Sequence, residues 1–245
     1  MVNLREKVAV ISGASSGIGR AAAEALARKG AFVVLAGRRA ERLEELARSI
    51  EQYNPNCLAV PTDATKEDDV RRLFDQAEGR FGRVDLLVNS AGRGLKASIP
   101  DITFDQWHQV MAANLDTVFL CSQQAMRRMI GKQVRGCIIT VGSIAGLYSV
   151  ANFAAYCAAK HAVTGFMRSL RWEARRHGIR AHTIFPARVD TEFFADYAEK
   201  PSRNQLLAPS DIARVIVALA GGCPFCVAAA RTRNFVKRVY TFCGL

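Results

Sequence analysis

The chain has 245 residues, of which 50% are hydrophobic and 23% are charged, and this composition excludes wholesale disorder and a collagen-like repeat. The length is sufficient for one large α/β domain, or for two small ones, with a buried core. Lysine and arginine number 34 against 22 acidic residues, and the resulting net charge of +12 permits anionic partners such as nucleic acid, a membrane surface or a phosphorylated ligand, without selecting among them.

Neither a secretory signal nor a membrane helix is expected. Residues 1–10 are too charged and too short in apolar sequence for a signal peptide. The longest uncharged segment, 136–159, carries Thr140, Ser143 and several glycines, which predicts a buried strand and a loop. Four cysteines are scattered singly, as expected of reduced thiols in a cytoplasmic protein: Cys57, Cys121, Cys137 and Cys157.

Short apolar runs alternate with long amphipathic segments along the chain. Strands are predicted at 8–11, 32–35, 57–60, 84–88, 137–141 and 179–185. Helices are predicted at 18–29, 40–53, 67–81, 104–130, 154–177 and 211–220, the last capped by Ser210. This alternation predicts βαβ units and a parallel sheet covered on both faces. Because no linker or repeat interrupts the pattern, we expect residues 1–220 to form one domain.

A glycine-rich turn lies between the first predicted strand and the first predicted helix. Gly13 permits a tight turn, Gly17 permits a pyrophosphate to approach the backbone, and Gly19 permits the helix to pack on the strand. The free N–H groups of the helix start would face the anion. Such a turn can be purely structural, but its position between a strand and a helix favours a phosphate-binding role.

Arg38 and Arg39 follow the second predicted strand. A dinucleotide with a free ribose 2′-hydroxyl favours an acidic residue at this place, whereas two guanidinium groups suit a 2′-phosphate. The alternative is that both arginines only begin a solvated helix. We therefore expect NADP(H) to be preferred over NAD(H).

Tyr156 and Lys160 are four residues apart on a predicted helix, so their side chains share one face. A tyrosine titrates at a pKa of about 10, which is too high for efficient proton transfer near neutrality, and a nearby ammonium group lowers that value. The spacing alone is common and often marks a surface pair. Ser143 follows the fifth strand, however, where a parallel sheet delivers residues to a ligand crevice.

Taken together, these motifs make the sequence similar to the short-chain dehydrogenase/reductase family, and the resemblance covers residues 5–220. The motifs of that family occur here in its order: the GxxxGIG turn at Gly13, Gly17 and Gly19, then Asp63, Asn89-Ser90-Ala91-Gly92, Asn114, Ser143, Tyr156-x-x-x-Lys160 and Pro186-Ala187-Arg188-Val189-Asp190-Thr191. The resemblance implies an α/β fold, a single-domain Rossmann-type doubly wound parallel sheet with strand order 3-2-1-4-5-6 and the seventh strand left open.

The resemblance also implies the catalytic roles. Tyr156 would be the general acid for carbonyl reduction or the base for alcohol oxidation, and Lys160 would lower its pKa and hold the nicotinamide ribose. Ser143 would hydrogen-bond the substrate oxygen, and Asn114 would hold a water in a proton relay. In the structural alternatives, Asn114 satisfies backbone groups and Ser143 caps a turn.

Cofactor contacts are implied along the same edge of the sheet. Asp63 and Ala64 would contact the adenine, although Asp63 could instead be a turn residue, and Val189 and Thr191 would contact the nicotinamide carboxamide. The full set of expected cofactor-binding residues is Gly13, Ser15, Ser16, Gly17, Ile18, Gly19, Arg38, Arg39, Asp63, Ala64, Asn89, Ala91, Gly92, Tyr156, Lys160, Pro186, Val189 and Thr191.

The expected function is an NADP(H)-dependent oxidoreductase that interconverts a carbonyl and an alcohol on a small molecule; the alternative is a non-catalytic NADP(H)-binding regulatory protein. Substrate contacts are expected in 93–98, 149–153 and 193–207. The resemblance further implies a homodimer or homotetramer. No nucleic-acid motif accompanies the basic charge.

The sequence departs from the family pattern mainly after Ala220. Segment 221–245 is basic and atypical, and 235–242 could still form a strand. One hypothesis is an alternative ending of the chain. Cys223 and Cys226 could be redox-active or half of a zinc site, but no second pair follows, so no metal is expected. Smaller departures are Ser12, Ser90 and Ala187.

Overall fold

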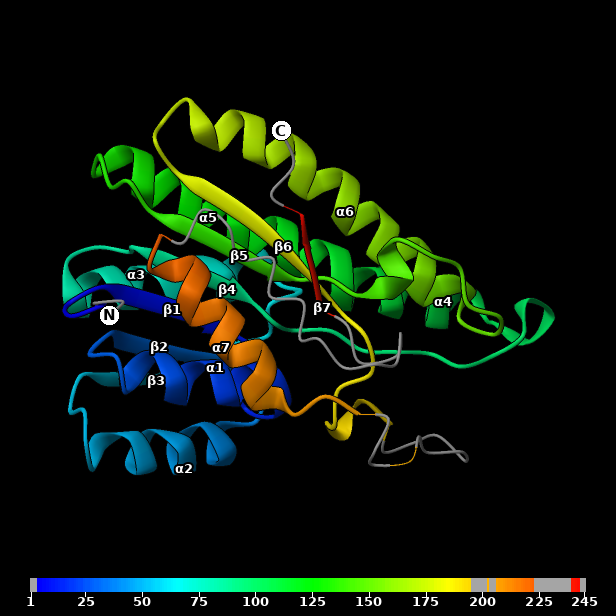
Figure 1. The fold of residues 1–245 in the computed structure, drawn as a ribbon, viewed down its shortest axis with the longest axis horizontal. Coiled ribbons are helices and arrows are strands. Elements are labelled where there is room, and N and C mark those ends of the chain that lie inside the picture. Colours follow the sequence, from blue (N-terminus) through cyan, green and yellow to red (C-terminus); the bar gives the residue numbers. More distant parts are fainter. Residues whose placement is uncertain (1–3, 195–201, 203–205, 223–238, 243–245) are drawn as a thin grey trace.

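One seven-stranded sheet organises the chain (Figure 1), and its strand order is β3-β2-β1-β4-β5-β6-β7. The computed structural model describes residues 4–194, 202, 206–222 and 239–242. The strands are β1 (Val8–Ser12), β2 (Phe32–Gly37), β3 (Cys57–Pro61), β4 (Leu86–Asn89), β5 (Cys137–Val141), β6 (Arg180–Pro186) and β7 (Val239–Phe242). The pairs from β3 to β6 are all parallel, which confirms the predicted α/β fold and its strand order.

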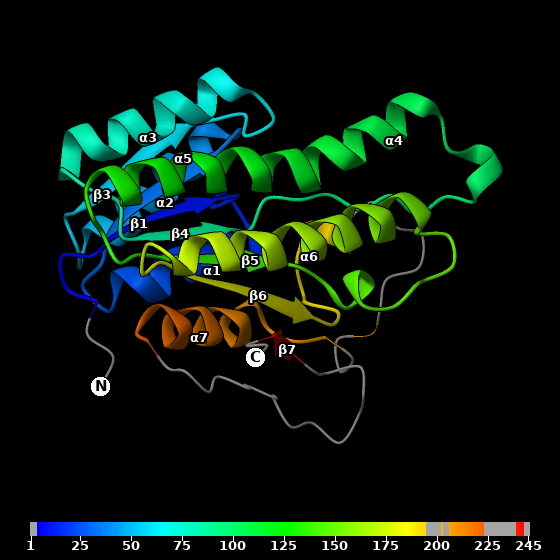
Figure 2. The same ribbon diagram turned by 90° about the horizontal axis from the view of Figure 1, so that it is seen from above.

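Helices cover both faces of the sheet, as the continuous apolar strands predicted. The helices are α1 (Gly17–Ala27), α2 (Ala40–Glu51), α3 (Glu67–Phe81), α4 (Phe104–Met111), α5 (Thr117–Gly131), α6 (Ala154–Arg175) and α7 (Pro209–Ala220). One core joins α1, α2 and α7 to one face, and a second core joins α3, α5 and α6 to the other. Figure 2 shows this division, with α3 and α5 on one side of the sheet and α7 on the opposite side.

Alternating strand residues supply the two cores. Ile11 of β1, for example, pairs with Leu35 of β2 and with Val88 of β4, and all three are fully buried in the first core. Val10, the preceding residue, belongs to the second core. A strand that is apolar at every position is therefore explained by burial on both faces.

The seventh strand joins the sheet in the opposite direction. β7 pairs antiparallel with β6, and Val239 lies opposite Pro186. The predicted strand at 235–242 thus exists in its last four residues, Val239–Phe242, whereas 235–238 lie outside the described residues. Cys223, Cys226 and Cys243 also lie outside them.

Two local expectations are wrong. The helix predicted at 104–130 is interrupted by η2 (Ala112–Asp116), a π-helical turn between α4 and α5. Ser210 does not cap α7: the helix begins at Pro209, two residues earlier than predicted, and the Asp211 carboxylate accepts the N–H of Ala208 at 2.9 Å. Proline is favoured at the first helical position because its missing N–H would have no partner there.

Short 3₁₀ turns complete the described structure, at η1 (Ile99–Asp101), η3 (Ile144–Gly146) and η4 (Glu192–Phe194). Within the described ranges, no helix combines the length and apolar character that crossing a membrane requires. The four cysteines that those ranges contain are unpaired thiols, and burial raises the pKa of Cys121 to about 12.

Candidate active site

The predicted site residues gather where the parallel strands end. Ser12 ends β1 and Asn89 ends β4, while Ser143 lies two residues beyond β5 and Pro186 ends β6. Parallel strands present their carboxyl ends at one edge of a sheet, which is where open α/β sheets bind ligands. The structure therefore brings the candidate residues from four strands to one edge.

The glycine-rich turn is tightly packed against the loop after β4. A Cβ on Gly13 would lie 2.7 Å from the Ala91 nitrogen, and a Cβ on Gly19 would lie 2.2 Å from the Gly13 oxygen. Gly17 has a φ of +54°, which disfavours residues with a side chain. These positions require glycine because any side chain would collide with backbone or strain it.

The start of α1 has the geometry of an anion site. Ser16 precedes the helix in an extended conformation, and its side chain makes no capping hydrogen bond within the described chain. The first-turn N–H groups are thus available to a phosphate, and the helix dipole favours negative charge there. This turn fits the pyrophosphate of a dinucleotide.

Arg39 extends from the N-terminus of α2 to the turn. Its Nε and Nη2 donate to Ser15 Oγ at 3.2 and 3.0 Å, and Nη2 also donates to Ser16 Oγ at 2.7 Å. Arg38 is exposed and makes no side-chain hydrogen bond to the described residues. The structure therefore brings only Arg39 of the predicted pair to the phosphate turn.

Lys160 is buried beneath Tyr156 on α6. Its side chain is 4% exposed, its Nζ donates to the Val141 carbonyl at 3.2 Å, and the same atom lies 5.6 Å from the centre of the Tyr156 ring. Desolvation lowers the pKa of Lys160 from 10.5 to about 8. The Tyr156 ring in turn packs 5.2 Å, centre to centre, from Phe193 of η4.

Ser143 precedes the turn η3, which packs against α6. Its Oγ accepts the Ala145 N–H at 3.1 Å. The structural alternative, in which Ser143 caps a turn, is thus observed. The hydroxyl can still donate its own proton to a ligand, because that bond uses only its acceptor side.

Asn114 occupies the π-helical turn and is fully buried. Its Nδ2 donates to the carbonyls of Val110 at 2.9 Å and Arg93 at 2.8 Å, while its Oδ1 has no partner among the described residues. A Cβ placed on Gly92 would lie 2.7 Å from this Oδ1 and 3.6 Å from Lys160 Nζ. A buried acceptor beside a buried ammonium group is a suitable place for an ordered water.

Asn89 and Asp63 are held by protein groups. Asn89 Nδ2 donates to Ser122 and Thr140, each at 3.1 Å, so its amide faces the interior beneath α5. The Asp63 carboxylate accepts from the Thr65 N–H and hydroxyl, as the turn alternative for Asp63 expects.

The loop after β6 closes against the phosphate turn. A Cβ on Gly17 would lie 2.9 Å from Thr191 Cγ2, and the loop is fixed by paired backbone hydrogen bonds of Asp190 and Arg188 with Leu207. A groove of about 560 Å³ is lined here by Ser15, Ser16, Gly17, Arg20, Ala21, Glu24, Arg42, Glu45, Asp190, Thr191, Glu192 and Pro209. Most of the segment 193–207, expected to contact substrate, lies outside the described residues.

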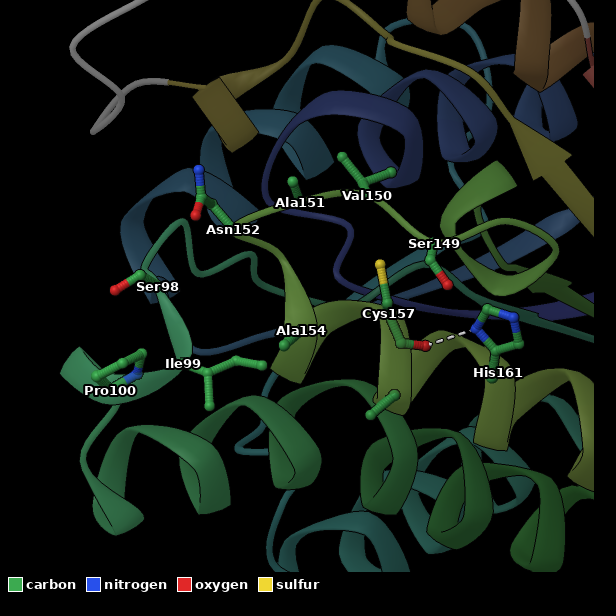
Figure 3. Close-up of a pocket in the computed structure, with 11 residues that line it drawn as sticks. Ser98, Ile99, Pro100, Ser149, Val150, Ala151, Asn152, Ala154, Cys157 and His161 are labelled. Atoms are coloured by element: carbon green, nitrogen blue, oxygen red, sulfur yellow. Dashed lines mark hydrogen bonds between the residues drawn. The ribbon is translucent and has the colours of Figure 1, made fainter.

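A second cavity, of about 730 Å³, lies between η1 and α6 (Figure 3). The expected substrate segments contribute Ser98 and residues 149–152 to it. The α6 face that lines it carries Cys157 and His161, one residue beyond Tyr156 and Lys160 respectively. Because successive helical residues point about 100° apart, this cavity is not on the face of Tyr156.

Sequence reasoning missed two charged residues of the site. Arg42 and Glu192 form an ion pair at 2.5 Å beside Arg39. Arg42 lies three residues after Arg39 at the start of a predicted helix. This spacing puts the two side chains on the same face, so the sequence could have indicated that Arg42 lies close to Arg39. Nothing in the sequence near Glu192 indicated that it would reach α2.

Comparison with known proteins agrees with this architecture. The family model described as short chain dehydrogenase matches residues 7–202. An oxidoreductase of Staphylococcus aureus strain USA300 is 36% identical over 217 residues, which are 89% of this chain and 92% of that protein. An alcohol dehydrogenase from Thermococcus sibiricus, solved with 5-hydroxy-NADP, has a TM-score of 0.81 and 29% identity and covers 87% of this chain and 89% of its own.

A short chain dehydrogenase/reductase from Burkholderia phymatum, solved in complex with NAD, has a TM-score of 0.82 and 29% identity and covers 90% of this chain and 88% of its own. Structures similar to this chain therefore include complexes of both kinds of nicotinamide cofactor. The chain belongs to the short-chain dehydrogenase family of oxidoreductases.

Proposed function

We propose that this protein is an NADP(H)-preferring oxidoreductase that interconverts a carbonyl and an alcohol, with Tyr156 as the general acid and base. Residues 1–220 would carry both the cofactor site and the catalytic residues. The observation that carries the proposal is the burial of the Lys160 ammonium group beside the Tyr156 ring.

That burial explains how a tyrosine could transfer a proton near neutral pH. A positive charge close to a phenol favours the phenolate, and the attraction is stronger where water is excluded. With its pKa at about 8, Lys160 remains mostly protonated at neutrality and keeps that charge. Tyr156 would then give a proton to the carbonyl oxygen in reduction and accept one from the alcohol in oxidation.

Ser143 and Asn114 would support this transfer from two sides. The Ser143 hydroxyl would donate to the substrate oxygen, where negative charge develops. Asn114 Oδ1, which lacks a partner in the described structure, would hold a water next to Lys160 and connect the site to solvent. When bound, the nicotinamide ring would supply the hydride in carbonyl reduction and accept it in alcohol oxidation, and the protein would orient the ring.

The preference for NADP(H) rests on Arg39. Its guanidinium group lies against Ser15 and Ser16 at the phosphate turn, where it could form a paired hydrogen bond to a ribose 2′-phosphate. At the end of β2, Gly37 is followed by Arg38 and Arg39, so the segment after β2 itself supplies two guanidinium groups and no carboxylate for a free 2′-hydroxyl.

The test measures NADPH and NADH binding by fluorescence titration and then follows NADPH oxidation with a panel of aldehydes and ketones. We expect tighter binding of NADPH and turnover of at least one carbonyl class. Equal or tighter binding of NADH would contradict the cofactor preference. NADPH binding without turnover of any carbonyl would instead favour a non-catalytic role.

We also propose that the protein is a homodimer or homotetramer that pairs through α5 and α6. Phe119 of α5 is 42% exposed and Trp172 of α6 is 61% exposed, although both are large and apolar. Apolar side chains exposed on neighbouring helices are typical of an interface. Light scattering at micromolar concentration should give at least twice the chain mass, and a monomer would contradict the proposal.

A further inference from the structure

An acidic side chain of η4 bridges two arginines at the start of α2. Glu192 Oε2 accepts from Arg39 Nη1 at 2.7 Å, and Glu192 Oε1 accepts from Arg42 Nη1 at 2.5 Å. The partners are 153 and 150 residues apart in sequence. The fold therefore places a carboxylate of the loop after β6 against the end of β2, although β1, which leads into the phosphate turn, lies between these two strands in the sheet.

This bridge takes one N–H donor from Arg39 and one from Arg42, both of which a 2′-phosphate could otherwise use. An arginine has five N–H groups, and in Arg39 four of them are engaged: three with the hydroxyls of Ser15 and Ser16 and one with Glu192. The pairing is also favourable for the carboxylate, because hydrogen bonds from Arg39 and Arg42 lower the pKa of Glu192. Glu192 thus remains an anion at neutral pH.

We propose that Glu192 is a specificity-determining residue that competes with the ribose 2′-phosphate for Arg39 and Arg42 and thereby limits the preference for the phosphorylated cofactor. The inference rests on the proposed NADP(H) preference. Carboxylate and phosphate oxygens accept from the same guanidinium N–H groups, so a 2′-phosphate bound to Nη1 of Arg39 and of Arg42 would displace Glu192. A carboxylate that remained in place would also repel the incoming phosphate.

The exposure of the three side chains limits the size of the effect. Arg39, Arg42 and Glu192 are 42%, 44% and 52% exposed. Exposed ion pairs are individually weak, so release of both pairs should change affinity by only about threefold to tenfold.

Two ligands that differ only in the 2′-phosphate provide the test: adenosine 2′,5′-bisphosphate and AMP. Their affinities are measured by calorimetry on the full chain and on Glu192→Gln, which keeps the size of the side chain and removes its charge. The matched control is Glu45→Gln, because Glu45 lines the same groove but pairs with Arg20 instead, at 3.3 Å. We expect Glu192→Gln to increase the affinity for the bisphosphate about threefold to tenfold and to leave the affinity for AMP within about twofold. Glu45→Gln should change neither affinity.

Arg39→Ala separates this inference from the proposal on which it rests. If Arg39→Ala weakens the bisphosphate but not AMP, Arg39 binds the 2′-phosphate and the cofactor proposal stands. An unchanged or weaker bisphosphate affinity in Glu192→Gln, or an equal gain for AMP, would then overturn the competition alone. If Arg39→Ala changes neither affinity, both the cofactor proposal and the inference are wrong.

Discussion

The Nζ atom of Lys160 lies 5.6 Å from the centre of the Tyr156 ring and donates a hydrogen bond to the Val141 carbonyl at 3.2 Å. This bond ties the ammonium group to the end of β5, which also leads to Ser143. The lysine is therefore held by the sheet and not only by its own helix. Its charge is fixed close to the tyrosine, in a place with little water to screen it.

Replacement of Lys160 by methionine should shift the pH profile of alcohol oxidation. The ammonium group favours the Tyr156 phenolate, so its removal should raise the pKa that limits kcat/KM and move the rising limb to higher pH. Initial rates across the pH range measure the shift. Lys132→Met, at the exposed end of α5, removes the same charge far from the site and should leave the profile unchanged. An identical profile in Lys160→Met would contradict the role given to the lysine.

Asn114→Ala should reduce kcat by about tenfold to a hundredfold and leave NADPH affinity within about twofold, because the residue would hold a water in the proton path and not the cofactor. Stopped-flow rates and fluorescence titration separate the two quantities.

A close structural match to Asn114 exists far from the site. Asn54 is also buried and donates its Nδ2 to two carbonyls, those of Ala27 and Ala31, at 3.0 and 2.8 Å. Asn54→Ala should therefore lower the free energy of unfolding by a similar amount and leave kcat unchanged. Equal losses of kcat in both variants would show that Asn114 acts only through stability.

Gly19→Ala should destabilise the protein by about 1–3 kcal/mol and weaken dinucleotide binding, since its Cβ would meet the Gly13 carbonyl at 2.2 Å and neither backbone can move freely. Urea unfolding of the free protein measures the change. Gly79→Ala is the control, because a Cβ at this position of α3 has nothing within 4 Å. That variant should be more stable by about 0.5–1 kcal/mol. A stable Gly19→Ala variant would contradict the packing argument.

His182 of β6 should make the fold sensitive to acid. Burial, with the charges of Arg180 and Arg171, lowers the pKa of His182 from 6.5 to about 4. Between these values the unfolded chain binds a proton that the folded chain does not, so the contribution of His182 to the free energy of unfolding falls as pH falls from 6.5 to 4. His182→Gln should lose less stability over this range than the natural chain in urea titrations. His177→Gln, at an exposed position, should lose as much stability over this range as the natural chain. An equal loss in His182→Gln would contradict the role given to His182.

Much of the fold follows from local sequence patterns. The strand 137–141 and the helix 67–81 were predicted with the bounds that the structure shows, because each is bordered by clear turn residues and has a regular apolar pattern. The π-helical turn around Asn114 could not be predicted, since a single additional residue in a helix leaves the apolar periodicity almost unchanged. The antiparallel direction of β7 also could not be predicted from the sequence, because its only described partner is β6, about 55 residues earlier in the chain.

The candidate site divides in the same way. Motif spacing was sufficient to predict Tyr156, Lys160 and Ser143 as site residues, because the first two lie on one helix and the third follows a strand end. Contacts that depend on the closed fold were missed, above all the bridge of Glu192 to Arg39. An ion pair between distant segments leaves no periodic pattern in the sequence, so it can be recognised only from the folded structure.

The most direct measurement of the central claim is the turnover of Tyr156→Phe with NADPH and a carbonyl that the natural chain reduces. The variant keeps the ring that packs on Phe193 and removes only the acidic hydroxyl. Tyr148→Phe, at a position that is 54% exposed, is the matched control. We predict that Tyr156→Phe loses activity by about a hundredfold or more while NADPH affinity and the activity of Tyr148→Phe stay within about twofold of the natural chain. Unchanged turnover in Tyr156→Phe would contradict the account.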